Sequence, residues 1–224
     1  MSARFFANRT TAGQALASRL AGEHLDNPVV LALPRGGVPV ALEIARRLRA
    51  PLDLVLVRKV GVPGRREVAA AAVVDGGEAE IVYNREVMRA AGLDDAEVHA
   101  EAAAELAEIE RRRATYLGGR RGEPLEGRTL VVVDDGIATG ATMRAALVAL
   151  RRKRPQRLIV AVPVAPRDVV DAIASLVDEV VCLEMPEPFY AVGLHYDDFE
   201  QLEDQDVITA LDEAATFGQR AAAT

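Results

Sequence analysis

Short apolar runs alternate along this chain with segments in which apolar residues recur at three- and four-residue spacing. The first pattern predicts buried strands and the second predicts helices, so the alternation indicates a mostly parallel sheet covered by helices. Strands are predicted over 29–33, 52–57, 69–74, 80–83, 130–133, 158–162 and 179–183. Helices are predicted over 11–20, 38–48, 140–152 and 167–176, with loops over 58–67 and 118–127.

A stretch rich in Ala, Glu and Arg interrupts this alternation between residues 85 and 116. We interpret it as two helices separated near Gly92, with Asp94 as the N-cap of the second helix. The run from Arg111 to Arg113 is typical of a solvated face near a helix C-terminus, although it could instead bind phosphate. The sequence therefore predicts one α/β domain spanning 1–224, with a helical insertion at about 84–117.

Composition and charge narrow the possible partners. Half of the 224 residues are hydrophobic, which is enough for the core of one domain. The formal net charge of −7 argues against a nucleic-acid partner but still allows a local basic pocket for a small anion. The single cysteine, Cys182, lies in an apolar run and is predicted to be a buried hydrophobe. No apolar stretch approaches the ~20 residues of a membrane span, so we expect a soluble, cytoplasmic protein without membrane contact.

The most informative segment is 130–142, with the sequence LVVVDDGIATGAT. Asp134 and Asp135 follow a predicted buried strand at its C-terminal end, where open α/β sheets bind ligands. A loop with two Gly and two Thr then leads into a helix, whose first backbone amides can bind a phosphate. The carboxylates cannot favour a phosphate by charge, and they suit ribose hydroxyls or a Mg²⁺-bound pyrophosphate. This arrangement predicts a ribose 5-phosphate site.

Other loops of similar composition differ in their key residues. The segment lacks the Gly-Lys-[Ser/Thr] of a nucleotide P-loop and the Gly-x-Gly-x-x-Gly of a dinucleotide fold. A tight turn with two capping threonines, without any ligand, remains an alternative.

The segment resembles, over all 13 residues, the phosphoribosyl pyrophosphate signature of the type I phosphoribosyltransferase family. The resemblance implies Mg²⁺ as the cofactor and implies that Asp134 and Asp135 receive the ribose 2′- and 3′-hydroxyls and hold the metal, directly or through water. It also implies that residues 138–142 hold the 5′-phosphate. The implied substrate-binding residues of this loop are Gly136, Ile137, Ala138, Thr139, Gly140, Ala141 and Thr142.

The segment LPRGG at 33–37 occupies the place of that family's pyrophosphate loop, which commonly contains a non-proline cis peptide. Gly36 and Gly37 would tolerate such a bond and offer amides to the pyrophosphate, and Arg35 supplies a planar cationic fork. Taken alone, the segment would be a simple turn before a helix.

The loop expected at 58–67 matches the family's mobile loop, which closes over the active site. The resemblance implies that Lys59 reaches the pyrophosphate and that Arg58 binds the substrate, while a solvated surface turn is the alternative for both. Together with Asp134, Asp135 and Arg35, Lys59 completes the expected catalytic set.

A hood is expected at about 184–216, and residues 184–198 within it are similar to the hood segment of hypoxanthine-guanine phosphoribosyltransferases, which implies that Phe189 or Tyr190 stacks on the base. A small satellite core of aromatic side chains is the alternative. His195 takes the place of a metal-binding Asp in that pattern, so it is a candidate metal ligand or a structural residue. The family's purine-reading lysine is absent from 163–167, where Arg167 is a candidate substitute, so the base is not identified.

Over about 5–211 the chain looks most like bacterial stand-alone predicted phosphoribosyltransferases. The implied fold is a mostly parallel twisted sheet flanked by helices, with a small hood and the helical insertion. The implied activity is Mg²⁺-dependent transfer of the phosphoribosyl group of 5-phosphoribosyl-1-pyrophosphate to a nitrogenous base, with release of pyrophosphate. A non-catalytic regulatory protein that binds the same sugar is the alternative, and dimers are common in the family.

Overall fold

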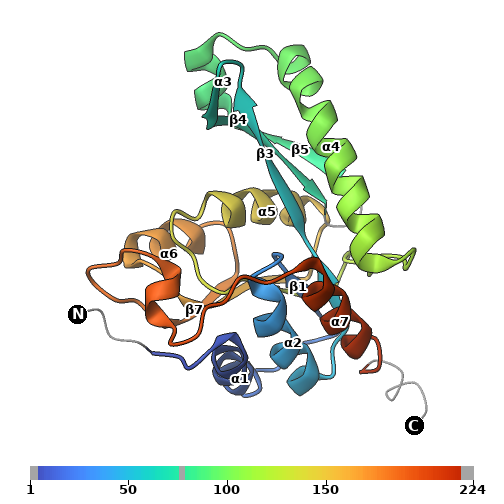
Figure 1. The fold of residues 1–224 in the computed structure, drawn as a ribbon, viewed down its shortest axis with the longest axis vertical. Coiled ribbons are helices and arrows are strands. Elements are labelled where there is room, and N and C mark those ends of the chain that lie inside the picture. Colours follow the sequence, from blue (N-terminus) through green and yellow to red (C-terminus); the bar gives the residue numbers. More distant parts are fainter. Residues whose placement is uncertain (1–4, 76–78, 218–224) are drawn as a thin grey trace.

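The computed structural model describes residues 5–75 and 79–217 (Figure 1). Its central sheet has the strand order β2-β1-β6-β7-β8, and each strand pairs in parallel with its neighbour. The sequence prediction of a mostly parallel sheet is confirmed. The strands are β1 (Pro28–Ala32), β2 (Leu52–Leu54), β6 (Thr129–Val133), β7 (Arg157–Val164) and β8 (Glu179–Glu184).

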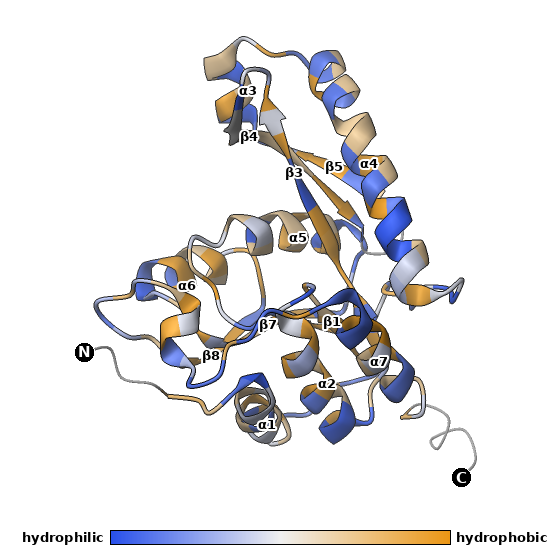
Figure 2. Cartoon of the chain, in the orientation of Figure 1, coloured by the Kyte–Doolittle hydropathy of each residue, from blue (hydrophilic) through white to orange (hydrophobic). Residues whose placement is uncertain are grey.

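Helices cover both faces of this sheet, which explains why its strands are continuous apolar runs rather than alternating ones. Val30 and Ala32 of β1 belong to the cluster that includes residues of α1, α2 and α7, whereas Val29 and Leu31 belong to the cluster that includes α5 and α6. Figure 2 shows strands that are mainly hydrophobic and helices that contain both hydrophobic and hydrophilic residues. The helices are α1 (Arg9–Leu20), α2 (Gly37–Leu48), α5 (Ala141–Arg152), α6 (Arg167–Ala174) and α7 (Asp204–Ala214).

A second sheet, which is antiparallel, extends away from the central sheet, and the helical insertion packs against it (Figure 1). It consists of β3 (Leu56–Val62), β4 (Arg65–Asp75) and β5 (Ala79–Tyr83). The two predicted helices are present as α3 (Arg85–Ala91) and α4 (Asp95–Leu117), and α4 packs along β3 and β4. Asp94 caps α4 as predicted, accepting a hydrogen bond from the Glu97 amide at 2.8 Å.

Two sequence predictions in this region are wrong. Residues 52–57 do not form one strand, because β2 ends at Leu54 and β3 begins at Leu56 in the other sheet. Residues 58–67 are not a loop but the turn end of the β3–β4 hairpin, which turns at Gly64 with φ +76°. The physical reason is that Val60 and Val62 are buried at alternate positions of β3, a signal that the surrounding charged residues obscure.

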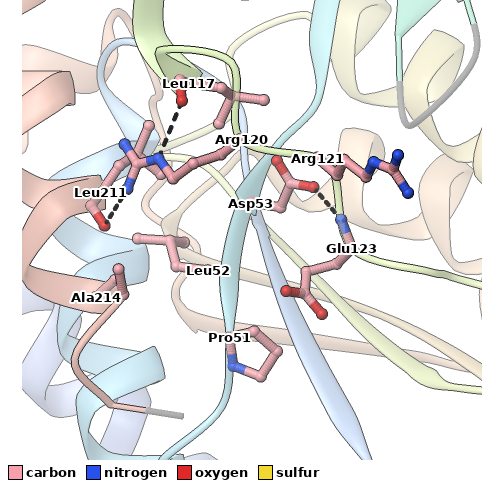
Figure 3. Close-up of a pocket in the computed structure, with 10 residues that line it drawn as sticks. Pro51, Leu52, Asp53, Leu117, Arg120, Arg121, Glu123, Leu211 and Ala214 are labelled. Carbon is pink, nitrogen blue, oxygen red and sulfur yellow. Dashed lines mark hydrogen bonds between the residues drawn. The ribbon is translucent and has the colours of Figure 1, made fainter. Parts of the chain in front are cut away.

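The return from α4 to the central sheet is fixed by buried and partly buried polar contacts (Figure 3). Asp53 of β2 accepts hydrogen bonds from the amides of Leu54 and Glu123, each at 2.8 Å. Arg120 donates to the carbonyls of Leu117 and Leu211. These groups line a cavity of about 430 Å³ at the start of β2. Because this is the amino end of a parallel strand, the cavity lies at the sheet edge opposite the predicted ligand site.

Within the described residues, no helix is both long enough and apolar enough to cross a membrane.

Candidate functional site

The loop from β6 to α5 lies at the carboxyl edge of the sheet, after its middle strand. Its start is anchored by the Ile137 amide, which donates to the Val164 carbonyl of β7 at 2.9 Å, and by the buried Ile137 side chain. Gly140 adopts a left-handed conformation with φ +73° as the N-cap of α5, and no side chain caps this helix. The first amides of α5 therefore face outward without an intrahelical partner, as a phosphate site requires.

The same geometry separates the predicted phosphate-binding residues into two groups. Ile137 is committed to the fold through both its amide and its side chain, so it positions the loop rather than presenting donors. The residues of the loop that are exposed are Ala138, Thr139, Ala141 and Thr142.

The loop at 33–37 lies directly against the aspartate pair. A Cβ at Gly36 would lie 2.1 Å from Asp135 Oδ2, and one at Gly37 would lie 2.6 Å from the Val133 carbonyl oxygen. Only glycine allows so close an approach. The peptide between Pro34 and Arg35 is cis, which is the non-proline cis bond expected for this loop.

The two aspartates differ in their electrostatic environment. The Asp134 carboxylate accepts a hydrogen bond from the Asp135 amide at 2.9 Å. Burial, together with the neighbouring Asp135 charge, holds the pKa of Asp134 well above its usual range. Burial also raises the pKa of Asp135, but Arg9 opposes this effect by donating from Nε to Asp135 Oδ2 at 2.8 Å. Asp135 thus has its own cation, whereas Asp134 lacks an ion pair among the described residues.

Aromatic side chains from the C-terminal segment hold Asp135 from the other side. The Tyr196 hydroxyl donates to the Asp135 carbonyl at 2.5 Å, and burial raises the pKa of Tyr196 so that this proton stays in place. The Arg9 guanidinium lies 3.8 Å from the centre of the Phe199 ring and donates to the Glu200 carbonyl at 2.8 Å. The aspartate pair is therefore joined rigidly to α1 and to residues 196–200.

A cavity of about 420 Å³ opens between these elements and the 33–37 loop. Three arginines, from α1, from the loop and from α4, give it a strongly cationic lining. The lining residues are Arg9, Pro34, Arg35, Gly36, Arg112, Phe199, Glu200, Gln201 and Leu202. Such a lining suits a compact anion with several negative charges.

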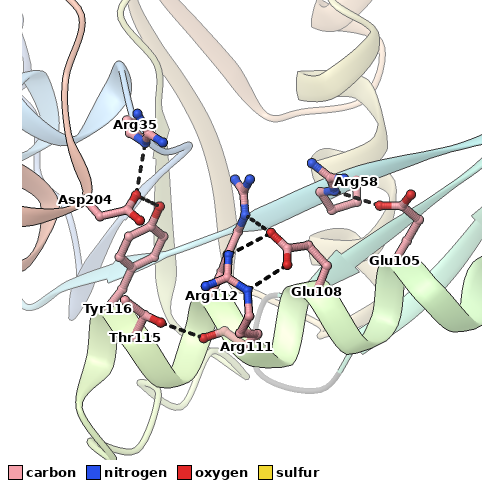
Figure 4. Close-up of polar contacts among 9 residues, drawn as sticks. All are labelled: Arg35, Arg58, Glu105, Glu108, Arg111, Arg112, Thr115, Tyr116 and Asp204. Carbon is pink, nitrogen blue, oxygen red and sulfur yellow. Dashed lines mark hydrogen bonds and ion pairs between the residues drawn. The ribbon is translucent and has the colours of Figure 1, made fainter.

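Arg35 lines this cavity, but its guanidinium is partly engaged (Figure 4). It donates to the Leu202 carbonyl at 2.6 Å and lies 3.1 Å from Asp204 Oδ1, which also accepts a hydrogen bond from Tyr116. Through these contacts the loop is connected to the start of α7 and the end of α4.

Residues 8–198 match the family model of the phosphoribosyl transferase domain. The chain belongs to this family. It is 46% identical over 211 residues to "Putative phosphoribosyl transferase Rv0571c" of Mycobacterium tuberculosis H37Rv, covering 94% of this chain and 47% of that protein. The same values hold for "Putative phosphoribosyl transferase MT0597" of strain CDC 1551, so the chain spans about half the length of the curated relatives it matches. The crystal structure of TT1426 from Thermus thermophilus is 45% identical, with a TM-score of 0.83 over 93% of this chain and 98% of that chain.

In this phosphoribosyl transferase domain, the two cations predicted after the second strand lie on β3 rather than in a loop. Arg58 pairs with Glu105 of α4 at 2.7 Å, and Lys59 is exposed. Neither residue lines the cavity at the 33–37 loop.

The aromatic residues of the hood are divided between packing and exposure. His195 is fully buried, with its ring centroid 5.6 Å from that of Phe5 and 5.2 Å from that of Phe189. This packing supports a structural role for His195 and gives no support to the expected metal ligand. Phe189 belongs to the same satellite core, whereas Tyr190 is 72% exposed. Of the two rings expected to stack on a base, Tyr190 is the accessible one.

Sequence reasoning missed Arg9 and the phenol of Tyr196 at this site, and it included Arg112 only within a run that could bind phosphate. Each reaches the site from a segment remote from the two recognisable loops. The signals in the sequence were the arginine run for Arg112 and the cluster of aromatic residues around Tyr196, whereas Arg9 gave none.

Proposed function

We propose that this domain transfers the phosphoribosyl group of 5-phosphoribosyl-1-pyrophosphate to a nitrogenous base and releases pyrophosphate, with Mg²⁺ as cofactor. The observation that carries the proposal is the contact of Gly36 and Gly37 with the Asp134–Asp135 pair. Because of this contact, the 33–37 loop and the β6–α5 loop both bring backbone amides close to the carboxylate pair. That geometry suits a sugar carrying a phosphate at one end and a diphosphate at the other.

The residues of the β6–α5 loop hold the substrate's sugar in this proposal. The amides and hydroxyls at Ala138, Thr139, Gly140, Ala141 and Thr142 bind the 5′-phosphate, and Gly136 allows the turn. Asp134 and Asp135 accept hydrogen bonds from the ribose hydroxyls. Their negative charge also stabilises the cationic character that develops on the sugar as the pyrophosphate leaves.

The aspartate pair fits Mg²⁺ that arrives with the diphosphate. No group of three or more His, Cys, Asp or Glu able to hold a metal occurs among the described residues. Mg²⁺ usually takes only one or two carboxylates from the protein together with substrate phosphates. Asp134 and Asp135 would hold it, directly or through water, and bound Mg²⁺ would neutralise charge on the leaving pyrophosphate.

The remaining roles concern the leaving group and the base. Arg35 and the Gly36 amide bind the pyrophosphate from the 33–37 loop, whereas the Gly37 amide, also expected to bind it, already donates to the Leu33 carbonyl at 3.0 Å. The β3–β4 hairpin closes over the site and brings Lys59 and Arg58 toward the same group, which excludes water from the reacting sugar. Tyr190 provides the ring that stacks on the base.

The test is pyrophosphate release from the activated sugar with Mg²⁺, measured across a panel of purines, pyrimidines and related heterocycles. At least one base should support release, and Asp135→Asn should lower the rate by about 10²–10³ because a preorganised electrostatic contact is lost. Binding of the sugar without release for every base would instead favour the regulatory protein. Absence of both binding and release would reject the proposal.

A further inference from the structure

The insertion helix α4 presents a polar stripe to the candidate site. Glu105, Glu108, Arg112 and Tyr116 are spaced by three or four residues, which places them on one face of the helix. Glu105 pairs with Arg58 of β3, and Tyr116 bonds Asp204 beside Arg35. Figure 4 shows these side chains in a row along α4. The insertion therefore forms a wall of the site rather than a separate appendage.

Arg112 is the member of this stripe that lines the cavity at the 33–37 loop. Its Nε donates to Glu108 Oε1 at 2.7 Å, and its terminal nitrogens make no hydrogen bond among the described residues. Hydrogen bonds from Arg111 and Arg112 lower the pKa of Glu108 to about 2, so this partner remains a carboxylate and fixes the Arg112 stem. Two parallel N–H groups are thus left to meet a ligand.

The other two arginines of the cavity have less capacity for a ligand. Arg9 is bonded to Asp135 and to the Glu200 carbonyl, and Arg35 to the Leu202 carbonyl with Asp204 nearby. Both therefore bridge parts of the fold, whereas within the described part of the chain Arg112 is hydrogen-bonded only inside its own helix. Of the three, Arg112 is best placed to receive an incoming anion with both terminal nitrogens.

We propose that Arg112 binds the pyrophosphate end of the substrate, as the contribution of the helical insertion to the site. This inference rests on the proposed function, because it assigns the diphosphate of the substrate to the cavity at the 33–37 loop. A guanidinium fork pairs with phosphate oxygens through two parallel hydrogen bonds, which is stronger and more directional than a single contact. Binding in this cavity would also bring α4 and the 33–37 loop together around one ligand.

The experiment measures binding by calorimetry to wild type, Arg112→Ala and Arg111→Ala, each in Mg²⁺. Arg111 is a matched control because it also pairs with Glu108 but is more exposed and does not line the cavity. The probes are 5-phosphoribosyl-1-pyrophosphate, inorganic pyrophosphate and ribose 5-phosphate. We expect Arg112→Ala to weaken binding of the two diphosphate-containing probes by at least tenfold, with ribose 5-phosphate binding unchanged. Arg111→Ala should bind all three probes as wild type does.

The outcomes separate this inference from the proposed function. Equal pyrophosphate affinity in wild type and Arg112→Ala would overturn the role of Arg112 even if the activated sugar binds. Equal losses in both variants would also overturn it, since they would indicate a general charge effect. Pyrophosphate binding that depends on Arg112, without any binding of the activated sugar, would support the anion site and reject the proposed function. Failure of wild type to bind either diphosphate probe would reject both.

Discussion

Replacing Asp134 with Asn should stabilise the protein at neutral pH while impairing substrate binding. Burial and the Asp135 charge raise the pKa of Asp134, so its ionised form is disfavoured in the folded state. An Asn side chain has the same shape, and its oxygen can still accept the hydrogen bond from the Asp135 amide. The substitution therefore removes a buried charge without removing a hydrogen bond.

The expected size and pH dependence follow from this environment. Relieving a destabilised functional group commonly raises the free energy of unfolding by about 0.5–2 kcal/mol, and each kcal/mol shifts the melting temperature by ~2–4 °C in a chain of this length. Because the pKa is higher in the folded than in the unfolded state, the native protein binds more protons between the two values. Wild-type stability should therefore fall as pH rises from about 3.9 through the folded pKa of Asp134. The advantage of the Asn variant should grow over the same interval.

Thermal unfolding between pH 4 and pH 8 tests this reasoning, with Asp178→Asn as a control of opposite sign. Burial raises the pKa of Asp178, but hydrogen bonds from the Leu158 amide and Arg151 outweigh burial, and the pKa lies below its usual range. Stability from Asp178 is thus present above the unfolded pKa, so its Asn variant should be less stable than wild type at pH 7. An Asp134→Asn variant that is no more stable than wild type at pH 7–8 would refute the electrostatic argument.

Three further predictions concern other parts of the site. Gly37→Ala should lower the free energy of unfolding by about 1–3 kcal/mol, because the added Cβ would lie 2.6 Å from a strand carbonyl oxygen. Gly22→Ala is the control: its Cβ would lie 3.8 Å from the nearest atom, so thermal unfolding should show almost no change. Arg9→Met keeps an apolar stem but leaves Asp135 without its cation; we expect a loss of about 1–3 kcal/mol that shrinks at low pH, as chemical denaturation would show. Lys59→Ala should lower pyrophosphate release about 10²-fold with an unchanged melting temperature, since Lys59 is exposed, and full activity would remove it from the catalytic set.

The central sheet could be predicted from the sequence because its inner strands, β1, β6 and β7, are buried on both faces. Such a strand appears as an uninterrupted apolar run, as at 130–133, and its neighbours in the chain are amphipathic helices. The first strand of the antiparallel hairpin was hidden because Arg58 and Lys59 stand together between the buried Leu56 and Val60, so the segment looks like a charged loop. The break at Val55 was also hidden, since both sheets bury the residues that flank it.

The candidate site could be predicted within its two signature loops, most directly where backbone geometry restricts the residue type. The close approach of two loops requires glycine at positions 36 and 37, and a left-handed conformation favours it at position 140. These glycines can therefore be recognised in the sequence. Arg9 and Tyr196 act by reaching a distant aspartate, and no local rule requires their residue type. Their positions follow from the packing of α1 and residues 196–200 on the sheet edge.

The run of three arginines in α4 shows how a sequence pattern can combine residues with unrelated environments. Successive residues on an α-helix point about 100° apart, so three adjacent side chains cannot share one face. Arg111 pairs with Glu108, and its side chain is 60% exposed. Arg113 pairs at 2.9 Å with Asp75, which is buried. Arg112, between them, lines the cavity at the 33–37 loop. The sequence offered a solvated face or a phosphate site for the run as a whole. The structure shows that the choice has to be made residue by residue, because only Arg112 has the direction that a ligand in the cavity requires.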